Sequence, residues 1–189
     1  MKHLRTTIAA ALFATGTALG AAYAASHANN PTVGGAAMMA DKPIAVNASN
    51  APNLTTLVAA AKAAGLVETL AGEGPFTVFA PTNAAFEKLP AGTVDTLLKP
   101  ENKEMLKSIL LYHVVPAKAS AEDAMKMISD DGGAHNVKTA SGGTITLKMQ
   151  GDTLVVIDES GNGAAVETAD VMQSNGVVHV IDTVLMPKN

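Results

Sequence analysis

The chain has 189 residues, a net charge of −4 at neutral pH and no cysteine. Without cysteine it can form neither disulfides nor thiolate metal sites, and it lacks a thiol nucleophile and a cysteine for a lipid anchor. Its one arginine, Arg5, lies near the start, so the rest of the chain lacks the planar donor group that suits phosphates and base edges. With an acidic charge balance as well, nucleic acid is not expected as a partner.

Residues 1–24 have the features of a signal peptide. Lys2 and Arg5 give a basic start, residues 8–19 are apolar, and Ala22-Tyr23-Ala24 supplies the small residues that a signal peptidase recognises. The apolar run is short for a bilayer span, and no second long apolar run follows. We therefore expect cleavage, no membrane span, and a mature protein that is secreted, periplasmic or on the cell surface. Cleavage removes two basic residues and changes the net charge from −4 to −6.

Residues 25–50 mix Asn, Ala, Gly and Pro without a regular period, which is typical of a flexible leader. Glycosylation sequons at Asn47 and Asn53 have a role only in a host that glycosylates secreted proteins. The remaining residues, 51–188, have the length of one domain that can fold without disulfides.

The first half of this domain predicts helices. One is expected to start at Asn53, as its cap, and to end at Gly65, with apolar residues on one face: Leu54, Leu57, Val58 and Ala61. Further helices are expected near residues 83–89, 93–98, 101–111 and 120–128. Thr82 or Asn83 is suited to cap the first of these, and Ser120 with Asp123 resembles a capping box for the last.

The second half predicts strands. Ile145, Leu147 and Met149 alternate with polar residues, which indicates a half-buried strand, and glycine-rich turns separate it from strands expected at 154–157, 165–171 and 177–184. An earlier compact run at 76–79 also predicts a short buried strand. Helices followed by a meander of strands predict an α+β fold, with helices packed on a small antiparallel sheet or sandwich.

Catalytic and metal sites are not evident in the sequence. His113, His135 and His179 are far apart and form no cluster with the spacing of metal ligands. A histidine between Val and Ile in a strand is usually a core group with its hydrogen bonds satisfied. The acidic pairs Asp130-Asp131 and Asp158-Glu159 stand beside glycine, so solvated turns explain them better than a Ca²⁺ loop. We expect no metal, no cofactor and no enzymatic activity.

Three segments resemble fasciclin-1 (FAS1) domains. Residues 77–86 (TVFAPTNAAF) resemble the first signature of that family, residues 175–187 (NGVVHVIDTVLMP) resemble the second, and Tyr112-His113-Val114-Val115 lies between them in the place of the Tyr-His motif. In this order, within about one domain's length, the match is specific. The resemblance, to secreted bacterial single-domain members, implies a wedge-shaped antiparallel β-sandwich flanked by several short α-helices. It also implies a surface adhesion module without catalytic activity.

The signature residues are expected to have structural roles in packing and hydrogen bonding. Pro81 fixes the turn from strand to helix, and Asp182 is expected to accept a hydrogen bond that ties the last strand to a loop. Along that strand, Val178 and Val180 are expected on one face, opposite Val177, His179 and Ile181. The residues with an expected structural role are Phe79, Pro81, Thr82, Asn83, Asn175, Gly176, His179 and Asp182.

Two segments are candidate partner contacts by the same resemblance. Tyr112-His113 is the first, although its apolar neighbours favour a core role, with Tyr112 at least partly buried. The second is Asp170-Val171-Met172, an Asp followed by two aliphatic residues just before the second signature. Thr168 and Ala169 depart here from the family's charged or proline-containing versions, and Asp170 is also suited to cap the turn at residues 173–176.

Three functions remain open. The first is a monomeric adhesion or macromolecule-binding module whose partner is a cell-surface or matrix protein or polysaccharide, strengthened by multivalent display. The second is a carrier or structural envelope protein that binds a small hydrophobic ligand, because nine methionines suit an adaptable pocket. The third is a hydrolase of envelope polymers, for which the sequence offers no catalytic constellation.

Overall fold

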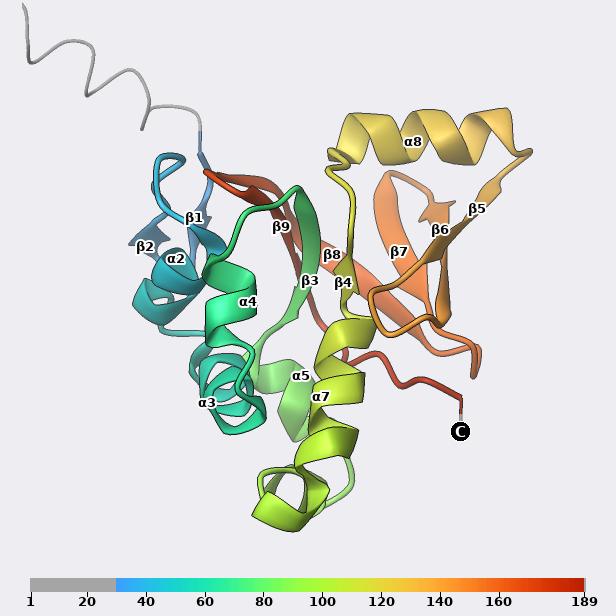
Figure 1. Cartoon of the computed structure of the whole chain (residues 1–189). Coiled ribbons are helices and arrows are strands. Elements are labelled where there is room, and N and C mark those ends of the chain that lie inside the picture. Colours follow the sequence, from blue (N-terminus) through green and yellow to red (C-terminus); the bar gives the residue numbers. More distant parts are fainter. Residues whose placement is uncertain (1–29, 189) are drawn as a thin grey trace, which may run out of the picture.

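A computed structural model describes residues 30–188, so the signal peptide predicted for residues 1–24 lies outside the described residues. Figure 1 shows most of the short helices on one side of a strongly bent sheet, with α8 (Ala121–Asp130) over the opposite end of it. The helices are α2 (Ile44–Asn50), α3 (Thr55–Ala64), α4 (Val67–Ala71), α5 (Asn83–Glu87), α6 (Thr93–Leu97), the 3-10 turn η1 (Pro100–Asn102), α7 (Lys103–Tyr112) and α8. The strands are β1 (Thr32–Val33), β2 (Ala36–Ala37), β3 (Phe76–Pro81), β4 (Val114–Val115), β5 (Ala134–Lys138), β6 (Thr144–Gln150), β7 (Thr153–Ile157), β8 (Gly163–Gln173) and β9 (Gly176–Ile181).

The main sheet has seven strands in the order β4-β3-β9-β8-β7-β6-β5. All neighbours are antiparallel except β3 and β9, which run parallel from Phe76 opposite Gly176 to Pro81 opposite Ile181. The predicted α+β fold, a mostly antiparallel sandwich flanked by short helices, is confirmed. The prediction of a wholly antiparallel sheet is wrong at this one pair, where the two signature segments lie side by side.

Strand β8 bends the sheet into two layers. Its N-terminal part pairs with β7 and its C-terminal part with β9. The register with β9 shifts between Val166 and Thr168 and again between Thr168 and Val171, and Asp170 has a φ of 56°. Such bulges add twist and bend a strand, so the β5–β7 half folds over toward β3 and β9 (Figure 1).

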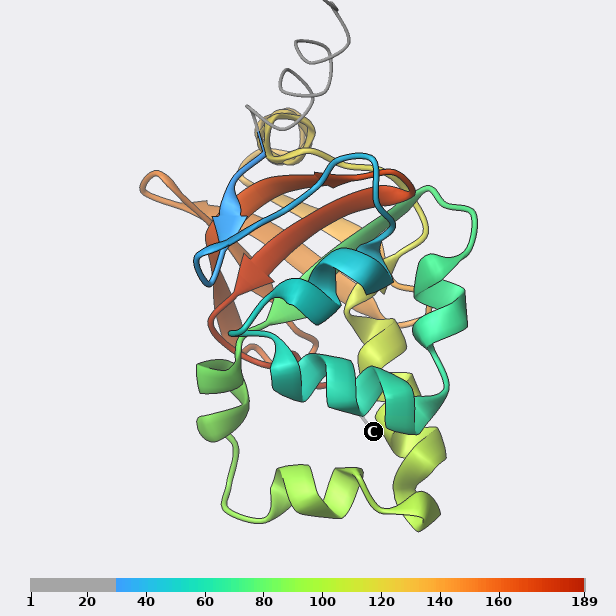
Figure 2. The same ribbon diagram turned by 90° about the vertical axis from the view of Figure 1, so that its left-hand side faces the viewer.

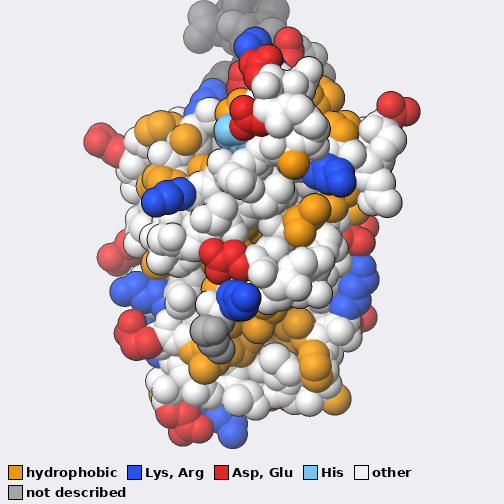
Figure 3. Space-filling view, turned by 90° about the vertical axis from the view of Figure 1, so that its right-hand side faces the viewer, with side chains coloured by type: hydrophobic (Ala, Val, Ile, Leu, Met, Phe, Trp, Pro, Cys, Tyr) orange, Lys and Arg blue, Asp and Glu red, His pale blue; other side chains and the backbone are white. Residues whose placement is uncertain are grey.

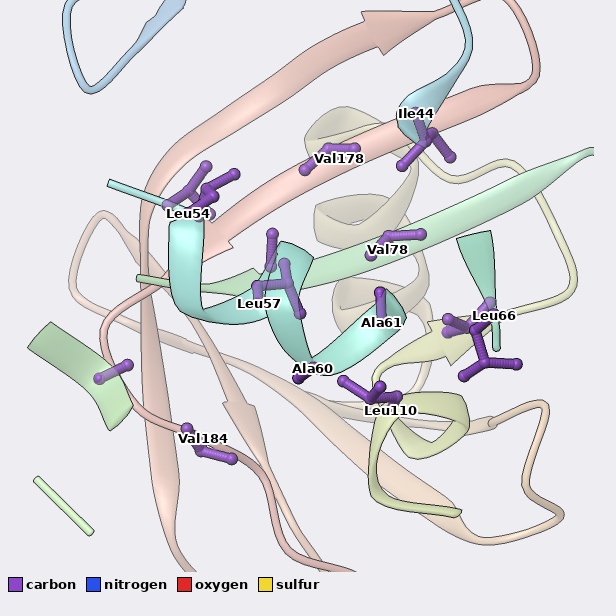
Figure 4. Close-up of a cluster of buried hydrophobic side chains, with 14 of the residues drawn as sticks. Ile44, Leu54, Leu57, Ala60, Ala61, Leu66, Val78, Leu110, Val178 and Val184 are labelled. Atoms are coloured by element: carbon purple, nitrogen blue, oxygen red, sulfur yellow. The ribbon is translucent and has the colours of Figure 1, made fainter. Parts of the chain in front are cut away.

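Each layer of the fold buries its own hydrophobic cluster. The helix-side cluster lies between the helices and one face of β3 and β9, and Figure 4 shows residues of α2, α3 and α7 gathered around Val78 and Val178. The sandwich-side cluster lies between the two halves of the sheet and contains Phe79 and Ile181. Because neighbouring residues of one strand enter different clusters, the predicted alternation along residues 177–181 is confirmed.

Residues 30–50 pack onto the domain, so the prediction of a flexible leader is wrong for this part of it. Val33, Met38 and Ile44 are buried in the helix-side cluster. Figure 2 shows the segment lying across the sheet, in front of the C-terminal strands. Only a few apolar residues anchor the segment, and they have no helical or strand period, which explains why composition alone indicated a loose chain.

Hydrogen bonds add to this packing. The Asn30 amide donates to the Met172 carbonyl oxygen (2.8 Å) and accepts from the Met172 N–H (2.7 Å). Asn47, one of the two sequon residues, is 1% exposed, and its amide donates to the Met39 carbonyl oxygen (2.7 Å) and to Gln173. Glycosylation of Asn47 is therefore incompatible with the folded state.

The cap of α3 differs from the prediction. Leu54 stands at the N-cap position without a side-chain bond, and the Thr56 N–H instead donates to Oδ1 of Asn83, 3.0 Å away. Asn53 therefore does not cap the helix. Three predicted boundaries are confirmed: the cap of α5 by Thr82, the capping box of Ser120 and Asp123 on α8, and the end of α3 at Gly65 in a left-handed conformation.

A pair of substitutions in α2 tests whether residues 30–50 belong to the fold. Ile44→Ala removes a buried side chain and should lower the free energy of unfolding by about 2–5 kcal/mol, measured by denaturant titration. Val46→Ala, on the exposed side of the same helix, is the matched control and should change it by no more than about 0.5 kcal/mol. Equal, small effects of both substitutions would contradict the packing described above.

Candidate functional site

Tyr112 is buried at the end of α7, as predicted. Its hydroxyl donates to the Thr144 carbonyl oxygen (2.8 Å) and accepts from the Glu159 N–H (3.0 Å). Its ring occupies the space where a side chain at Gly143 would stand, since a Cβ there would come within 2.7 Å of the ring. Burial raises the pKa of Tyr112, so the phenol stays neutral and joins α7 to two strand ends.

His113 uses both ring nitrogens inside the core. Nδ1 lies 2.8 Å from the Ile109 carbonyl oxygen, and Nε2 accepts the Leu185 N–H at 2.9 Å. Because a carbonyl can only accept, Nδ1 carries the proton. Burial lowers the pKa of His113 to about 4, so the ring is neutral and links α7 to the C-terminal segment.

The candidate contact Tyr112-His113 is therefore a core pair. The side chains are 0% and 2% exposed, and their polar atoms are bonded to the backbone. A contact role for these side chains does not fit the folded domain, whereas the core role weighed against it does.

His179 stands in the middle of the central strand β9 and is 1% exposed. Its ring stacks on Phe79 with 5.6 Å between ring centres. Nε2 donates to the Ala119 carbonyl oxygen (3.1 Å), and Nδ1 accepts the Asp170 N–H (3.3 Å). Burial lowers the pKa of His179, which favours the neutral ring.

The segment Asp170-Val171-Met172 is only partly accessible. Val171 is buried in the helix-side cluster, while Asp170 and Met172 are half-buried. Oδ1 of Asp170 accepts the N–H of Ala121, the first residue of α8, at 2.7 Å. The prediction that Asp170 caps the turn at residues 173–176 is therefore wrong, because its carboxylate faces the start of a helix, where a negative charge is favourable.

The turn from β8 to β9 depends on Asn175 and Gly176. The Asn175 amide donates to the carbonyl oxygens of Leu70 and Gly72, both at 2.8 Å, and its Oδ1 accepts the Ile44 N–H at 3.0 Å. Gly176 passes so close to β3 that an added Cβ would lie 2.0 Å from the Phe76 carbonyl oxygen. Only glycine fits there, so both residues act in packing.

Asp182 closes the end of β9. Its Oδ1 accepts the Ala165 N–H (2.8 Å) and its Oδ2 lies 3.0 Å from the Lys88 amine. Partial burial alone would raise its pKa, but these donors hold it below its usual range. The predicted acceptor role is confirmed, with strand β8 and the end of α5 as the partners rather than a loop.

Asp158 is a buried acid whose role the sequence reasoning missed. It is 5% exposed, and its carboxylate accepts the backbone N–H groups of Ser160, Asn162 and Met186 at 2.9–3.1 Å. The prediction of a solvated turn is wrong for this residue. The run Asp-Glu-Ser-Gly-Asn at residues 158–162 is the available signal, since Asp side chains often bond the backbone of their own turn.

An apolar cavity of about 60 Å³ lies in the helix-side cluster, among α2, α3, α4 and the sheet. Its walls include Ile44, Leu54, Leu57, Leu66, Val78 and Leu110, and Met38 is the only methionine among the lining residues of the described chain. In residues 30–188 no group of three His, Asp or Glu residues is placed to hold a metal ion, and no helix is long and apolar enough to cross a membrane.

A sequence model of the fasciclin domain matches residues 52–187. The chain belongs to the fasciclin-domain family. Among its relatives, protein sll1483 of Synechocystis is 51% identical over 133 residues, which are 70% of this chain and 67% of that one. Immunogenic protein MPB70 of Mycobacterium bovis is 42% identical over 181 residues, 92% and 84% of the two chains. The cell surface glycolipoprotein MPB83 of the same species is 42% identical over 172 residues, 88% and 70% of the two chains.

The fold agrees with this assignment. A FAS1 domain pair from the insect cell adhesion molecule Fasciclin I superposes with a TM-score of 0.67 at 22% identity, covering 77% of this chain. This chain spans about half the length of that domain pair, at 51%. This likeness establishes the fold.

The buried histidines predict a pH dependence of stability. Because the pKa of His113 falls from 6.5 to about 4 on folding, the unfolded chain binds more protons between these values. The contribution of His113 to the free energy of unfolding should be complete above pH 6.5. It should decrease by about 3 kcal/mol as the pH falls toward 4, and His179 should act in the same direction.

Denaturant titrations at a series of pH values measure this effect. His113→Gln removes the ionising ring and should be less stable at neutral pH but show a shallower decrease between pH 6.5 and 4. An equal decrease in the variant and the unmodified protein would show that another group is responsible.

Proposed function

We propose that this fasciclin-domain protein is an exported, non-catalytic module that binds a protein or polysaccharide at the cell surface or in the surrounding matrix. The observation that carries the proposal is that side chains capable of acid–base chemistry are already hydrogen-bonded within the fold. Tyr112, His113, His179, Asp158 and Asp182 all spend their polar atoms on hydrogen bonds within the fold. Such groups are committed to bonds within the fold, which leaves recognition to other side chains on the outer surface.

The relatives support a surface role. One of them is named a cell surface glycolipoprotein, and the superposed structure comes from a cell adhesion molecule. Asp170 and Met172 are the members of the second candidate contact segment that reach the surface. We propose that they belong to the contact, with Asp170 both supporting α8 and presenting negative charge.

The carrier alternative has less support. Pockets for small ligands usually have volumes of about 300–1,000 Å³, whereas the cavity of the helix-side cluster has about 60 Å³. The methionines that suggested an adaptable pocket lie mostly outside its walls. Core packing therefore explains the cavity and the buried Met38, whereas Met39, Met105 and Met125 are exposed.

Retention of cells on the immobilised mature domain tests the proposed function. We expect cells of the source organism or its host to be retained above background, with no hydrolysis of envelope polymers and no lipid extracted from the purified protein. Retention at background together with a co-purifying lipid would favour the carrier instead. Release of soluble sugars from envelope polymers would favour a hydrolase.

Asp170→Asn tests the contact segment in the same assay. Asn tolerates a positive φ and keeps the oxygen that accepts the Ala121 N–H, so the fold should persist while the charge is lost. We expect about tenfold weaker retention, corresponding to roughly 1.4 kcal/mol. Asp152→Asn, in the exposed turn between β6 and β7, removes the same charge and should leave retention unchanged. Equal effects of the two variants would exclude a specific role for Asp170.

A further inference from the structure

Strand β5 is a free edge of the main sheet. It stands last in the strand order and pairs only with β6, in five consecutive pairs from Ala134 opposite Lys148 to Lys138 opposite Thr144. Outside that ladder, no backbone hydrogen bond joins residues 134–138 to another part of chain 30–188. Figure 1 shows β5 at the right-hand margin of the sheet, below α8.

The alternation of bonded and non-bonded pairs along the ladder identifies which backbone N–H and C=O groups of β5 point away from the sheet. The Thr139 N–H donates to the carbonyl oxygen of Gly143, the residue opposite it in the continued register, at 2.9 Å. Opposite residues in an antiparallel pair alternate between bonded and non-bonded pairs, so Val137 and His135 bond to β6. The N–H and C=O groups of Ala134, Asn136 and Lys138 therefore face away from the sheet.

The outward edge is accessible, and two lysines lie on one face of the sheet beside it. Ala134, Asn136 and Lys138 are exposed, and Lys148, beside Ala134 on the same face of the sheet, is exposed as well. Neither lysine has an ion pair within the described residues. Figure 3 faces this side of the molecule and shows charges of both signs scattered over it.

We propose that the free edge of β5 is a docking site for an extended acidic segment of a partner protein, which adds to the sheet as a further strand. The inference rests on the proposed binding function and names the kind of partner. Outward N–H and C=O groups supply the affinity in strand addition, and alternate side chains supply specificity. Carboxylates on one face of the added strand would lie near Lys138 and, across the small Ala134, near Lys148.

The same lysines argue against a second copy of this chain as the occupant. Antiparallel pairing of two β5 strands around Asn136 would place Lys138 of one copy opposite Ala134 of the other, next to Lys148 of that copy. Like charges on neighbouring strands are unfavourable, and edge lysines are a common protection against self-association. An acidic strand is attracted by the same two lysines that repel a second copy of the chain.

Amide hydrogen exchange measured with and without a peptide tests the proposal. The probe is a peptide of about ten residues in which Thr and Glu alternate, and a Thr-Lys peptide of equal length is its control. In the free protein the amides of Asn136 and Lys138 should exchange much faster than that of Val137. Saturating Thr-Glu peptide should slow them at least tenfold, whereas the Thr-Lys peptide should have no effect. Slow exchange of both amides in the free protein, or protection elsewhere only, would overturn the proposal.

Asn136→Pro removes one outward N–H without removing a backbone bond to β6, so it should abolish peptide binding and leave the fold intact. Asn136→Ala is the matched control, because it loses the same side-chain bond to Thr146 and keeps the N–H. Peptide binding to the folded proline variant at unchanged affinity would overturn the proposal.

A charge reversal, Lys138→Glu with Lys148→Glu, keeps the test valid if the proline variant does not fold. This variant should prefer the Thr-Lys peptide, and an unchanged preference would overturn the proposal. The cell-retention assay separates the two proposals. If Asn136→Pro still retains cells, the adhesive function stands and β5 is not its site. If the peptide binds at β5 but the protein retains no cells, the β5 docking site stands and the adhesive function is wrong.

Discussion

Every polar group that the sheet buries has to find a hydrogen-bond partner, and the central strand makes this constraint severe. All six residues of β9 are buried, between β3 on one side and β8 on the other, with a hydrophobic cluster on each face. His179 brings an imidazole into this strand. The ring is accommodated because the Ala119 carbonyl oxygen and the Asp170 N–H are held in place for its two nitrogens. An unpaired ring there would cost about 1–3 kcal/mol.

The same constraint explains the family signatures. Asn83, Asn175 and Asp182 each join segments that are distant in sequence, and each of them bonds at least one backbone N–H or C=O group. Removing any of them would leave these backbone groups without their partners, so their chemistry is committed to the fold. This division of labour gives the outer surface freedom to vary, and recognition can change without disturbing the sandwich.

Local features of this fold could be predicted from the sequence and distant pairings could not. The caps at Thr82 and Ser120 and the alternating faces of β9 depend on residues within a few positions of one another. Parallel pairing of β3 with β9 and the bond from Asp170 to Ala121 join residues far apart, for which a single sequence carries no periodic signal. The packing of residues 30–50 is unpredictable for the same reason, because the groups that hold this segment lie on β8, β9 and the helices.

The tautomers of the two buried histidines test the central claim most directly. The claim is that His113 and His179 are neutral hydrogen-bonding links in the core. Proton–nitrogen correlation spectra of the imidazoles near neutral pH should place the single ring proton on Nδ1 of His113 and on Nε2 of His179, with neither ring exchanging with solvent. A charged ring, the opposite tautomer, or rapid averaging at either position would contradict the account and reopen these residues as a site of chemistry.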